Sequence, residues 1–170
     1  SRFACNEAAL AVFLMMVVNT MTPEKSIFKA YDIRGIVGKT LTPEVTYAVG
    51  LVLGSMARDA GIDSLCVGRD GRVSGPELSE SLMKGIAAAG TKVIDIGRVP
   101  TPVLYFAAHY FKNGSGVAVT GSHNPPEYNG YKMMLGGKTL FGEGIQDIYR
   151  AICENRYKPA ETPAAIERVS

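Results

Sequence analysis

The chain has 170 residues, of which 46% are hydrophobic and 20% are charged, as in an ordinary globular domain with a substantial core. Its 18 basic and 16 acidic residues leave a formal net charge of only +2, which is too small to indicate a nucleic-acid partner. The three widely separated cysteines and two histidines argue against a disulfide framework or a structural metal centre, and they favour a reducing, cytoplasmic compartment.

The first 20 residues differ in composition from the rest of the chain. Residues 8–18 form an unbroken apolar run of eleven, which is too short for a membrane span of ~20 residues. The run has the length of a signal-peptide core, but residues 18–20 form a poor cleavage site. We expect residues 1–20 to be a non-native extension or a segment upstream of a start at Met21. An extra packed helix and an export signal are the alternatives.

Helical and strand patterns alternate from Thr42 onward. Thr42, Pro43 and Glu44 combine a capping residue, a proline at the first helical position and a first-turn acid, which together predict a helix start. Apolar spacing predicts four helices, over residues 42–61, 76–90, 101–110 and 143–155. Short apolar segments predict four strands, over residues 64–68, 92–97, 116–120 and 130–135.

This alternation indicates parallel strands joined by right-handed crossovers. We predict a three-layer α/β/α sandwich with a mainly parallel, mixed sheet of about four strands. The domain would span residues 21–155, and residues 156–170, with two prolines, would form a tail or linker. Open α/β sheets bind ligands at the carboxyl ends of their strands. That edge would carry Arg69 and Asp70 after the first strand and Ser122 after the third.

Ser122 is the candidate catalytic residue, and two kinds of chemistry are possible for it. A hydrolytic serine usually lies in a G-x-S-x-G elbow beside a base, but Asn124 occupies the second glycine position. The adjacent His123 would point away from Ser122 on an extended loop. The other histidine, His109, falls in a predicted helix, where we expect a core or surface role. A serine hydrolase is therefore the weaker interpretation.

The second chemistry makes Ser122 a carrier of a phosphoryl group. This role requires backbone N–H groups and cations near the oxygen rather than a strong base. Gly121 would let the backbone approach closely, Asn124 can donate from its amide, and Lys132 returns a positive charge from the next strand. A tight turn built from glycine, asparagine and proline explains the glycine and prolines equally well. Both interpretations stay open on the residues alone.

Other polar and aromatic residues near this loop have simpler expected roles. Arg69 and Arg72 precede a helix start and could attract an anion, but we expect both to pair with Asp70 or Glu77 instead. Two tyrosines flank the loop, and we expect both to support it by packing: Tyr128 and Tyr131.

Three motifs together resemble the α-D-phosphohexomutase family. "FKAYDIRG" (28–35) resembles the N-terminal signature, "GRDGRVSGPEL" (68–78) the first-domain pattern, and "TGSHNPPEYNGYK" (120–132) the phosphoserine loop. The motifs occur in the family's order, within residues 27–152. Their form points to the phosphomannomutase/phosphoglucomutase branch. A phosphoglucosamine mutase and a non-catalytic sugar-phosphate-binding module are the alternatives.

The resemblance implies an isomerase of carbohydrate metabolism that interconverts the 1-phosphate and 6-phosphate of mannose or glucose through a 1,6-bisphosphate intermediate. Ser122 would be the serine that carries the phosphoryl group. Arg34 and Lys132 match positions assigned to charge stabilisation and proton transfer. The remaining matches are a substrate-contacting tyrosine and two supporting residues of the loop: Tyr31, His123 and Asn124.

The resemblance also implies Mg²⁺, with a phosphate oxygen on Ser122 as one ligand, and glucose 1,6-bisphosphate as activator. The family's enzymes have four domains and bind the metal with a D-G-D-G-D loop, which this sequence lacks. One ligand is far short of the ~six that Mg²⁺ takes. We therefore expect this chain to be a first domain that turns over little or no substrate alone.

Overall fold

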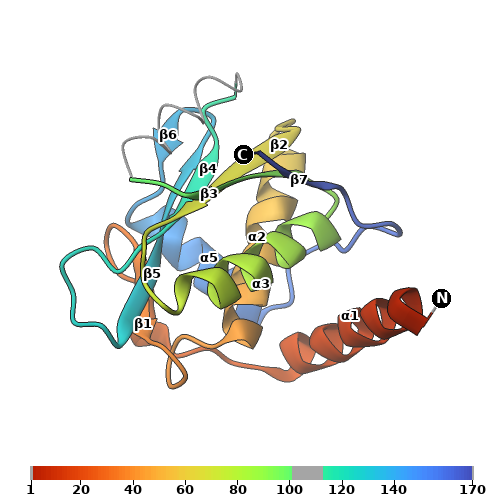
Figure 1. Ribbon diagram of the computed structural model, residues 1–170, viewed down its shortest axis with the longest axis horizontal. Coiled ribbons are helices and arrows are strands. Elements are labelled where there is room, and N and C mark those ends of the chain that lie inside the picture. The colour runs from red at the N-terminus through yellow and green to blue at the C-terminus, as the bar shows by residue number, and fades with distance from the viewer. Residues whose placement is uncertain (1, 101–112, 170) are drawn as a thin grey trace.

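A mixed β-sheet forms the centre of the computed structural model, which describes residues 2–100 and 113–169. Within these ranges the sheet has seven strands in the order β1-β5-β4-β2-β3-β7, with β6 paired to β5 (Figure 1). The strands are β1 (Ile33–Ile36), β2 (Ser64–Arg69), β3 (Lys92–Arg98), β4 (Gly116–Val119), β5 (Tyr128–Leu135), β6 (Lys138–Thr139) and β7 (Ile166–Arg168). The four predicted strands are confirmed as β2 to β5, and three short strands that we did not predict extend the sheet from about four strands to seven.

The strand directions bring two loops together at one edge of the sheet. β2 runs parallel to β3 and β4, and β3 runs parallel to β7. β5 runs antiparallel to β1, β4 and β6. The register places Arg69, at the end of β2, beside Val119 at the end of β4. The predicted mixed sheet and the predicted meeting of these two strand ends are therefore confirmed.

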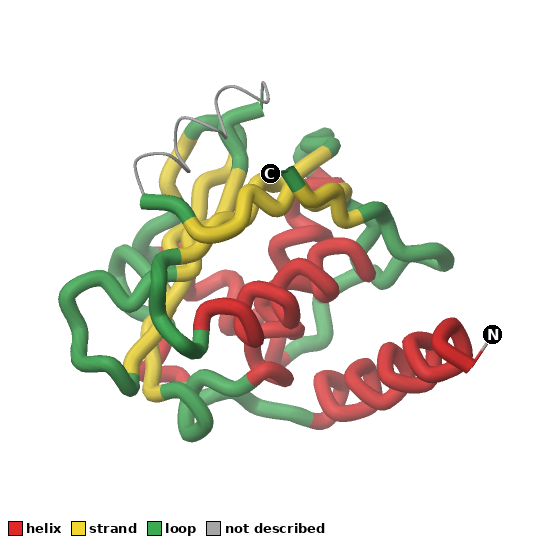
Figure 2. Tube along the Cα trace, in the orientation of Figure 1, coloured by secondary structure: helices red, strands yellow, loops and turns green. Residues whose placement is uncertain are grey.

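Three helices complete the main core on one face of the sheet. They are α2 (Pro43–Asp59), α3 (Gly75–Ala88) and α5 (Glu143–Cys153), and Figure 2 shows them in red beside the yellow strands. Alternate strand residues such as Val67 and Val117 belong to this core. The residues between them point to the opposite face, where Cys66 and Ala118 contribute to a second buried cluster. The helix predicted over residues 101–110 lies outside the described residues.

The ends of the helices follow the predicted capping chemistry. Thr42 accepts a hydrogen bond from the Val45 N–H at 3.2 Å and precedes Pro43, the first residue of α2. Gly61 and Gly90 follow α2 and α3 with φ of +72° and +89°, a backbone region that favours glycine. Local sequence therefore determines where these helices begin and end.

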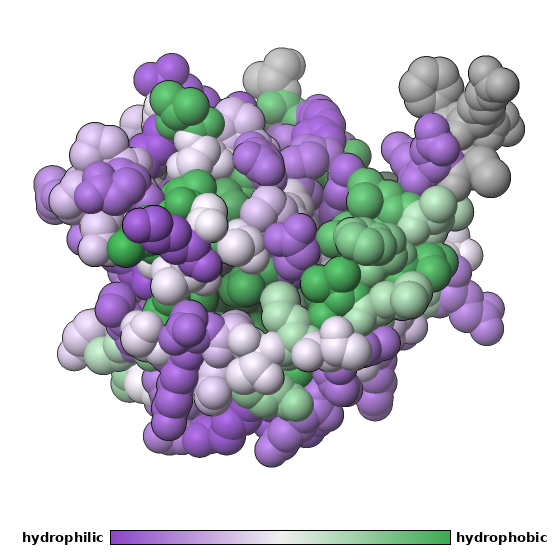
Figure 3. Space-filling model, turned by 90° about the horizontal axis from the view of Figure 1, so that it is seen from below, coloured by the Kyte–Doolittle hydropathy of each residue, from purple (hydrophilic) through white to green (hydrophobic). Residues whose placement is uncertain are grey.

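The N-terminal segment forms α1 (Arg2–Thr20), which extends from one side of the molecule and is followed by the short 3₁₀ helix η1 (Lys25–Ile27) (Figure 1). Val18 near its end is buried, and the Tyr157 hydroxyl donates to Asn19 Oδ1 at 2.5 Å. Farther out, α1 exposes an apolar strip, visible in green in Figure 3, that consists of Leu10, Val12, Phe13 and Met16. Every helix within the described ranges is too short or too polar to span a bilayer.

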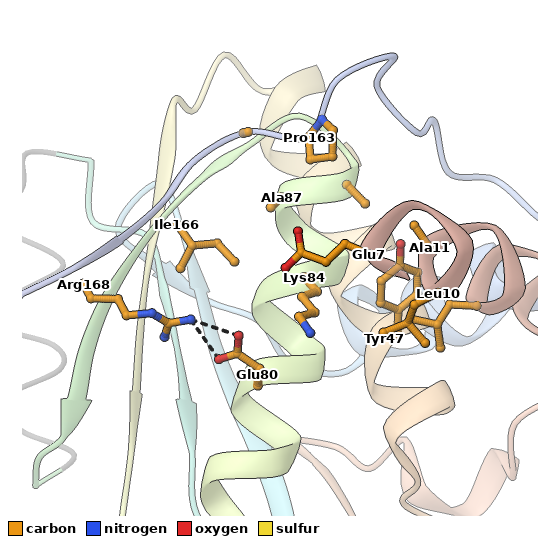
Figure 4. A pocket seen from close by; sticks show the side chains of 13 residues that line it. Glu7, Leu10, Ala11, Tyr47, Glu80, Lys84, Ala87, Pro163, Ile166 and Arg168 are labelled. Carbon is orange, nitrogen blue, oxygen red and sulfur yellow. Dashed lines mark hydrogen bonds and ion pairs between the residues drawn. The ribbon is translucent and has the colours of Figure 1, made fainter. Parts of the chain in front are cut away.

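The C-terminal segment, predicted to be a tail or linker, adds β7 to the sheet. Arg168 of β7 donates to Asp95 Oδ2 at 2.7 Å and to Glu80 of α3 at 2.9 Å. A cavity of about 300 Å³ lies between α1, α3 and this segment (Figure 4). Its lining includes Leu10 from α1, Lys84 from α3 and Arg168. This cavity is distinct from the edge that carries Ser122.

Candidate active site

Ser122 lies just beyond β4 in a loop of residues 120–127, which we call the serine loop. Its side chain is exposed and its φ is +52°, a left-handed backbone conformation that is uncommon for a residue with a side chain. The Ser122 N–H donates to Thr120 Oγ1 at 2.9 Å. The loop therefore presents this hydroxyl to solvent from a backbone that is held from within.

Asp70, which follows β2, fixes the start of the serine loop. Its Oδ2 accepts hydrogen bonds from Thr120 Oγ1 at 3.0 Å and from the Gly121 N–H at 2.8 Å. Its Oδ1 accepts from the Arg72 N–H at 3.0 Å. Hydrogen bonds to a charged carboxylate are stronger than those between neutral groups. Asp70 therefore joins the loop after β2 firmly to the loop after β4.

Arg72 binds the serine loop through its guanidinium group. Nη1 donates to two carbonyl oxygens, at 2.5 and 3.0 Å, and Nη2 donates to two others, at 2.6 and 3.3 Å. In that order, the acceptors belong to Pro125, Tyr128, Asn124 and Ser122. The predicted pairing with Asp70 is present, with Arg72 Nε 3.8 Å from Asp70 Oδ2. Our sequence interpretation missed the loop contacts, for which the motif "GRDGR" is the available signal.

Gly121 has a different purpose from the one we predicted. An added Cβ at this position would overlap Nε and Cζ of Arg72, so the absent side chain makes room for the guanidinium group. The Asn124 amide, which we predicted to be a donor, donates to the Gly121 carbonyl at 3.2 Å. Both features therefore serve the internal structure of the serine loop. The N–H groups of Gly121 and Ser122 also donate hydrogen bonds to side chains within the site.

Arg34 and Lys132, the two predicted cations of the site, project from the same face of the sheet. Arg34 lies opposite Gly130 across β1 and β5, and Lys132 is the next residue on that face of β5. Such diagonal neighbours are about 7–8 Å apart. The Arg34 guanidinium donates to the Thr120 carbonyl at 2.9 Å and forms an ion pair with Asp32 at 2.9 Å. Arg34 is therefore bound to the start of the serine loop.

The remaining predicted residues divide between the surface and the core. Tyr31 is 74% exposed, so it does not pack into the core. His123 is exposed, and Lys132 is half-buried. Tyr131 is fully buried and its hydroxyl lies 2.5 Å from Thr46 Oγ1, so it is a core residue. His109 lies outside the described residues.

The described residues do not form a metal site by themselves. In the ranges that the structure covers, no group of three His, Cys, Asp or Glu side chains is gathered closely enough to hold an ion.

Burial raises the pKa of the Cys66 thiol to about 11, so this cysteine stays protonated and unreactive near neutral pH. This edge therefore offers an exposed hydroxyl on Ser122, on a loop whose first residue, Thr120, is bound by Arg34.

The sequence is similar to known enzymes along most of its length. Residues 25–158 match the family model described as "Phosphoglucomutase/phosphomannomutase, alpha/beta/alpha domain I". The chain is 54% identical over 136 residues to a phosphoglucomutase of Neisseria meningitidis serogroup B, covering 80% of this chain and 30% of the relative. It is 50% identical over 141 residues to the phosphomannomutase/phosphoglucomutase of Pseudomonas aeruginosa PAO1, covering 83% and 30%.

A solved structure gives the same result for the fold. The crystal structure of a phosphoglucomutase/phosphomannomutase family protein from Burkholderia thailandensis matches with a TM-score of 0.82 and 44% identity, covering 87% of this chain and 34% of that chain. The chain thus spans about a third or less of each of these three proteins. The predicted α/β/α architecture agrees with the description of the matching domain. This chain therefore belongs to the phosphoglucomutase/phosphomannomutase family, of which it carries domain I.

Proposed function

We propose that this chain is the phosphoserine-bearing first domain of a phosphohexomutase, an isomerase of carbohydrate metabolism. The substrates would be the 1-phosphate and 6-phosphate of mannose or glucose. Residues 21–155 would form the domain, and residues 156–170 would lead into further domains that complete the enzyme. Relatives of about three times the matched length carry the names phosphoglucomutase and phosphomannomutase/phosphoglucomutase, which supports this assignment.

A single observation carries the proposal. Ser122 is an exposed serine in a left-handed conformation, held on a fixed loop at the sheet edge where α/β proteins bind ligands. Arg34 contacts the start of that loop and shares its face of the sheet with Lys132. An exposed hydroxyl with nearby cations suits a group that carries phosphate. It does not require the adjacent base that a hydrolytic serine needs.

The proposed reaction transfers one phosphoryl group in each direction. A hydroxyl oxygen of the hexose monophosphate attacks the phosphorus on Ser122, the bond from phosphorus to Ser122 Oγ breaks, and a hexose 1,6-bisphosphate forms. After the bisphosphate turns over in the site, Ser122 Oγ attacks the other phosphorus, the bond from that phosphorus to the sugar oxygen breaks, and the isomeric hexose monophosphate leaves. Arg34 and Lys132 would stabilise the charge on the transferring group, with Lys132 also handling the hydroxyl proton. Tyr31 would contact the sugar, while His123 and Asn124 support the loop.

The cofactor and location belong to the same proposal. Glucose 1,6-bisphosphate would phosphorylate Ser122, and a phosphate oxygen there would be one ligand of Mg²⁺. Because the sequence lacks the D-G-D-G-D loop that the family uses for the metal, the rest of the coordination sphere would come from outside this domain. The unpaired thiols of Cys66 and Cys153 support a cytoplasmic enzyme.

A chimaeric enzyme would test the proposal. Residues 25–158 would replace the matching region of the Pseudomonas aeruginosa relative, and the product would be incubated with glucose 1,6-bisphosphate. We expect mutase activity and a mass gain of one phosphate, both lost in Ser122→Ala. Ser26→Ala, at another exposed serine, is the matched control and should behave like the parent. A folded chimaera without activity or phosphate uptake would support a non-catalytic sugar-phosphate-binding module instead.

A further inference from the structure

We propose that Arg72, held in place by Asp70, is the positioning residue of the serine loop. The proposal rests on the proposed function for its meaning, because the loop then presents the hydroxyl that accepts phosphate. The positioning role itself concerns only the conformation of the serine loop. Arg72 follows β2 and lies fifty residues before Ser122, so a distant part of the sequence would determine how this hydroxyl is held.

The geometry makes one guanidinium group the common partner of both halves of the loop. Its two terminal nitrogens donate to the carbonyl oxygens of Ser122 and Asn124 in the first half of the loop, of Pro125 in the second half, and of Tyr128 at the start of β5. Arg72 is only 17% exposed, so little water is available to replace these bonds. Four carbonyl groups that face one another would otherwise repel. Arg72 therefore closes the loop around a positive charge.

Two further contacts show that the surroundings are shaped for this arginine. Asp70 accepts from the Arg72 backbone N–H at 3.0 Å and also lies 3.8 Å from its side-chain Nε. Gly121 leaves open the space that Nε and Cζ occupy. A lysine carries the same charge but lacks the planar, forked set of donors that can serve four acceptors at once. The site therefore requires arginine, and not only a cation, at position 72.

Amide hydrogen exchange of the 170-residue chain would test this inference without any phosphoryl transfer. Two amides donate to carbonyl groups of the loop and report on its closure: the Asn124 N–H donates to the Gly121 carbonyl, and the N–H of Tyr128, the first residue of β5, donates to the Pro125 carbonyl, both at 3.0 Å. In Arg72→Ala we expect both to exchange at least about tenfold faster, because the hydrogen bonds that hold their turns are lost. Amides of the core strands β2 and β4 should keep their rates.

Two matched variants sharpen the test. Arg58→Ala removes another arginine, an exposed one, that donates to a backbone carbonyl, that of Ala89 at 3.0 Å, and should leave the loop amides unchanged. Arg72→Lys should restore only part of the protection. Full protection in Arg72→Lys would overturn the requirement for a forked donor. Unchanged loop exchange in Arg72→Ala, or faster exchange throughout the chain, would overturn the positioning role.

The same variants separate this inference from the proposed function. In the chimaera, Arg72→Ala should slow phosphorylation of Ser122 by glucose 1,6-bisphosphate, and Arg58→Ala should not. If the chimaera takes up no phosphate while the exchange pattern is as expected, the proposed function fails and the positioning role stands. If phosphate is taken up at the same rate in Arg72→Ala and the loop amides stay protected, the positioning role fails and the proposed function stands.

Discussion

At the scale of single residues, the site is organised by side chains that do not themselves reach the exposed hydroxyl. Asp70 accepts two hydrogen bonds from the serine loop, and the Arg72 guanidinium donates to three carbonyl groups of the loop and to that of Tyr128. These hydrogen bonds hold the backbone of Ser122 in a left-handed conformation, which a residue with a side chain does not favour by itself. The predicted order of the strands was enough to place Ser122 at the sheet edge. The role of Gly121 depends on contacts between distant residues, which no local sequence pattern reveals.

Gly121→Ala should therefore act through Arg72. The new Cβ would overlap the guanidinium group, so Arg72 must leave its four carbonyl partners. We expect loop exchange to rise as in Arg72→Ala. In the double variant the two effects should not add, because both remove the same interaction. Additive effects in a double-mutant cycle would contradict this explanation.

A second residue-scale prediction concerns the pH dependence of stability. Burial raises the pKa of Cys66 from 9.0 to about 11. Between these values the unfolded chain loses this proton while the folded chain keeps it, so the free energy of unfolding should fall as pH rises and be unaffected by Cys66 below pH 9. Urea unfolding from pH 8 to 11 should show a shallower decline in Cys66→Ala. Ser26→Ala, at an exposed position without a titrating group, is the control and should follow the parent curve.

At the scale of elements, the parts that sequence could predict are those whose own residues specify them. α2 has a capping threonine and a terminating glycine, and the central strands are continuous apolar segments. β1 and β7 were not predicted because each is short and contains charged residues. β1 exists because β5 offers it an antiparallel partner. β7 exists because Arg168 pairs with Asp95 and Glu80 beside β3.

The crossing of α2 and α3 gives the element-scale prediction. A Cβ on Gly85 of α3 would overlap the Tyr47 carbonyl oxygen of α2 and come within 3.0 Å of Gly50 Cα. Gly85→Ala should lower the free energy of unfolding by about 1–3 kcal/mol, because the helices must move apart. At Gly144 of α5 the nearest atom to an added Cβ is 3.7 Å away. Gly144→Ala should therefore raise stability by about 0.5 kcal/mol. Chemical denaturation of both variants would show opposite signs, and a stabilising Gly85→Ala would contradict the close crossing.

At the scale of the whole molecule, α1 contrasts with the rest of the fold. Its C-terminal part packs on the core through Leu14, Met15 and buried Val18, and Asn19 accepts from the Tyr157 hydroxyl. Its outer part exposes Leu10 and Phe13 (Figure 3). The matched family domain begins at residue 25, after α1. The core on the sheet therefore does not depend on the outer part of this helix.

Two truncations should separate the parts of α1. Removal of residues 1–13 keeps Val18 and Asn19, so the free energy of unfolding should change by less than about 1 kcal/mol. Removal of residues 1–20 takes away the buried valine and the partner of Tyr157, and should lower it by roughly 2–4 kcal/mol. Urea denaturation of both proteins would measure these changes. If the shorter deletion abolished cooperative unfolding, α1 would be an essential part of the domain, and the boundary that we place near Met21 would be wrong.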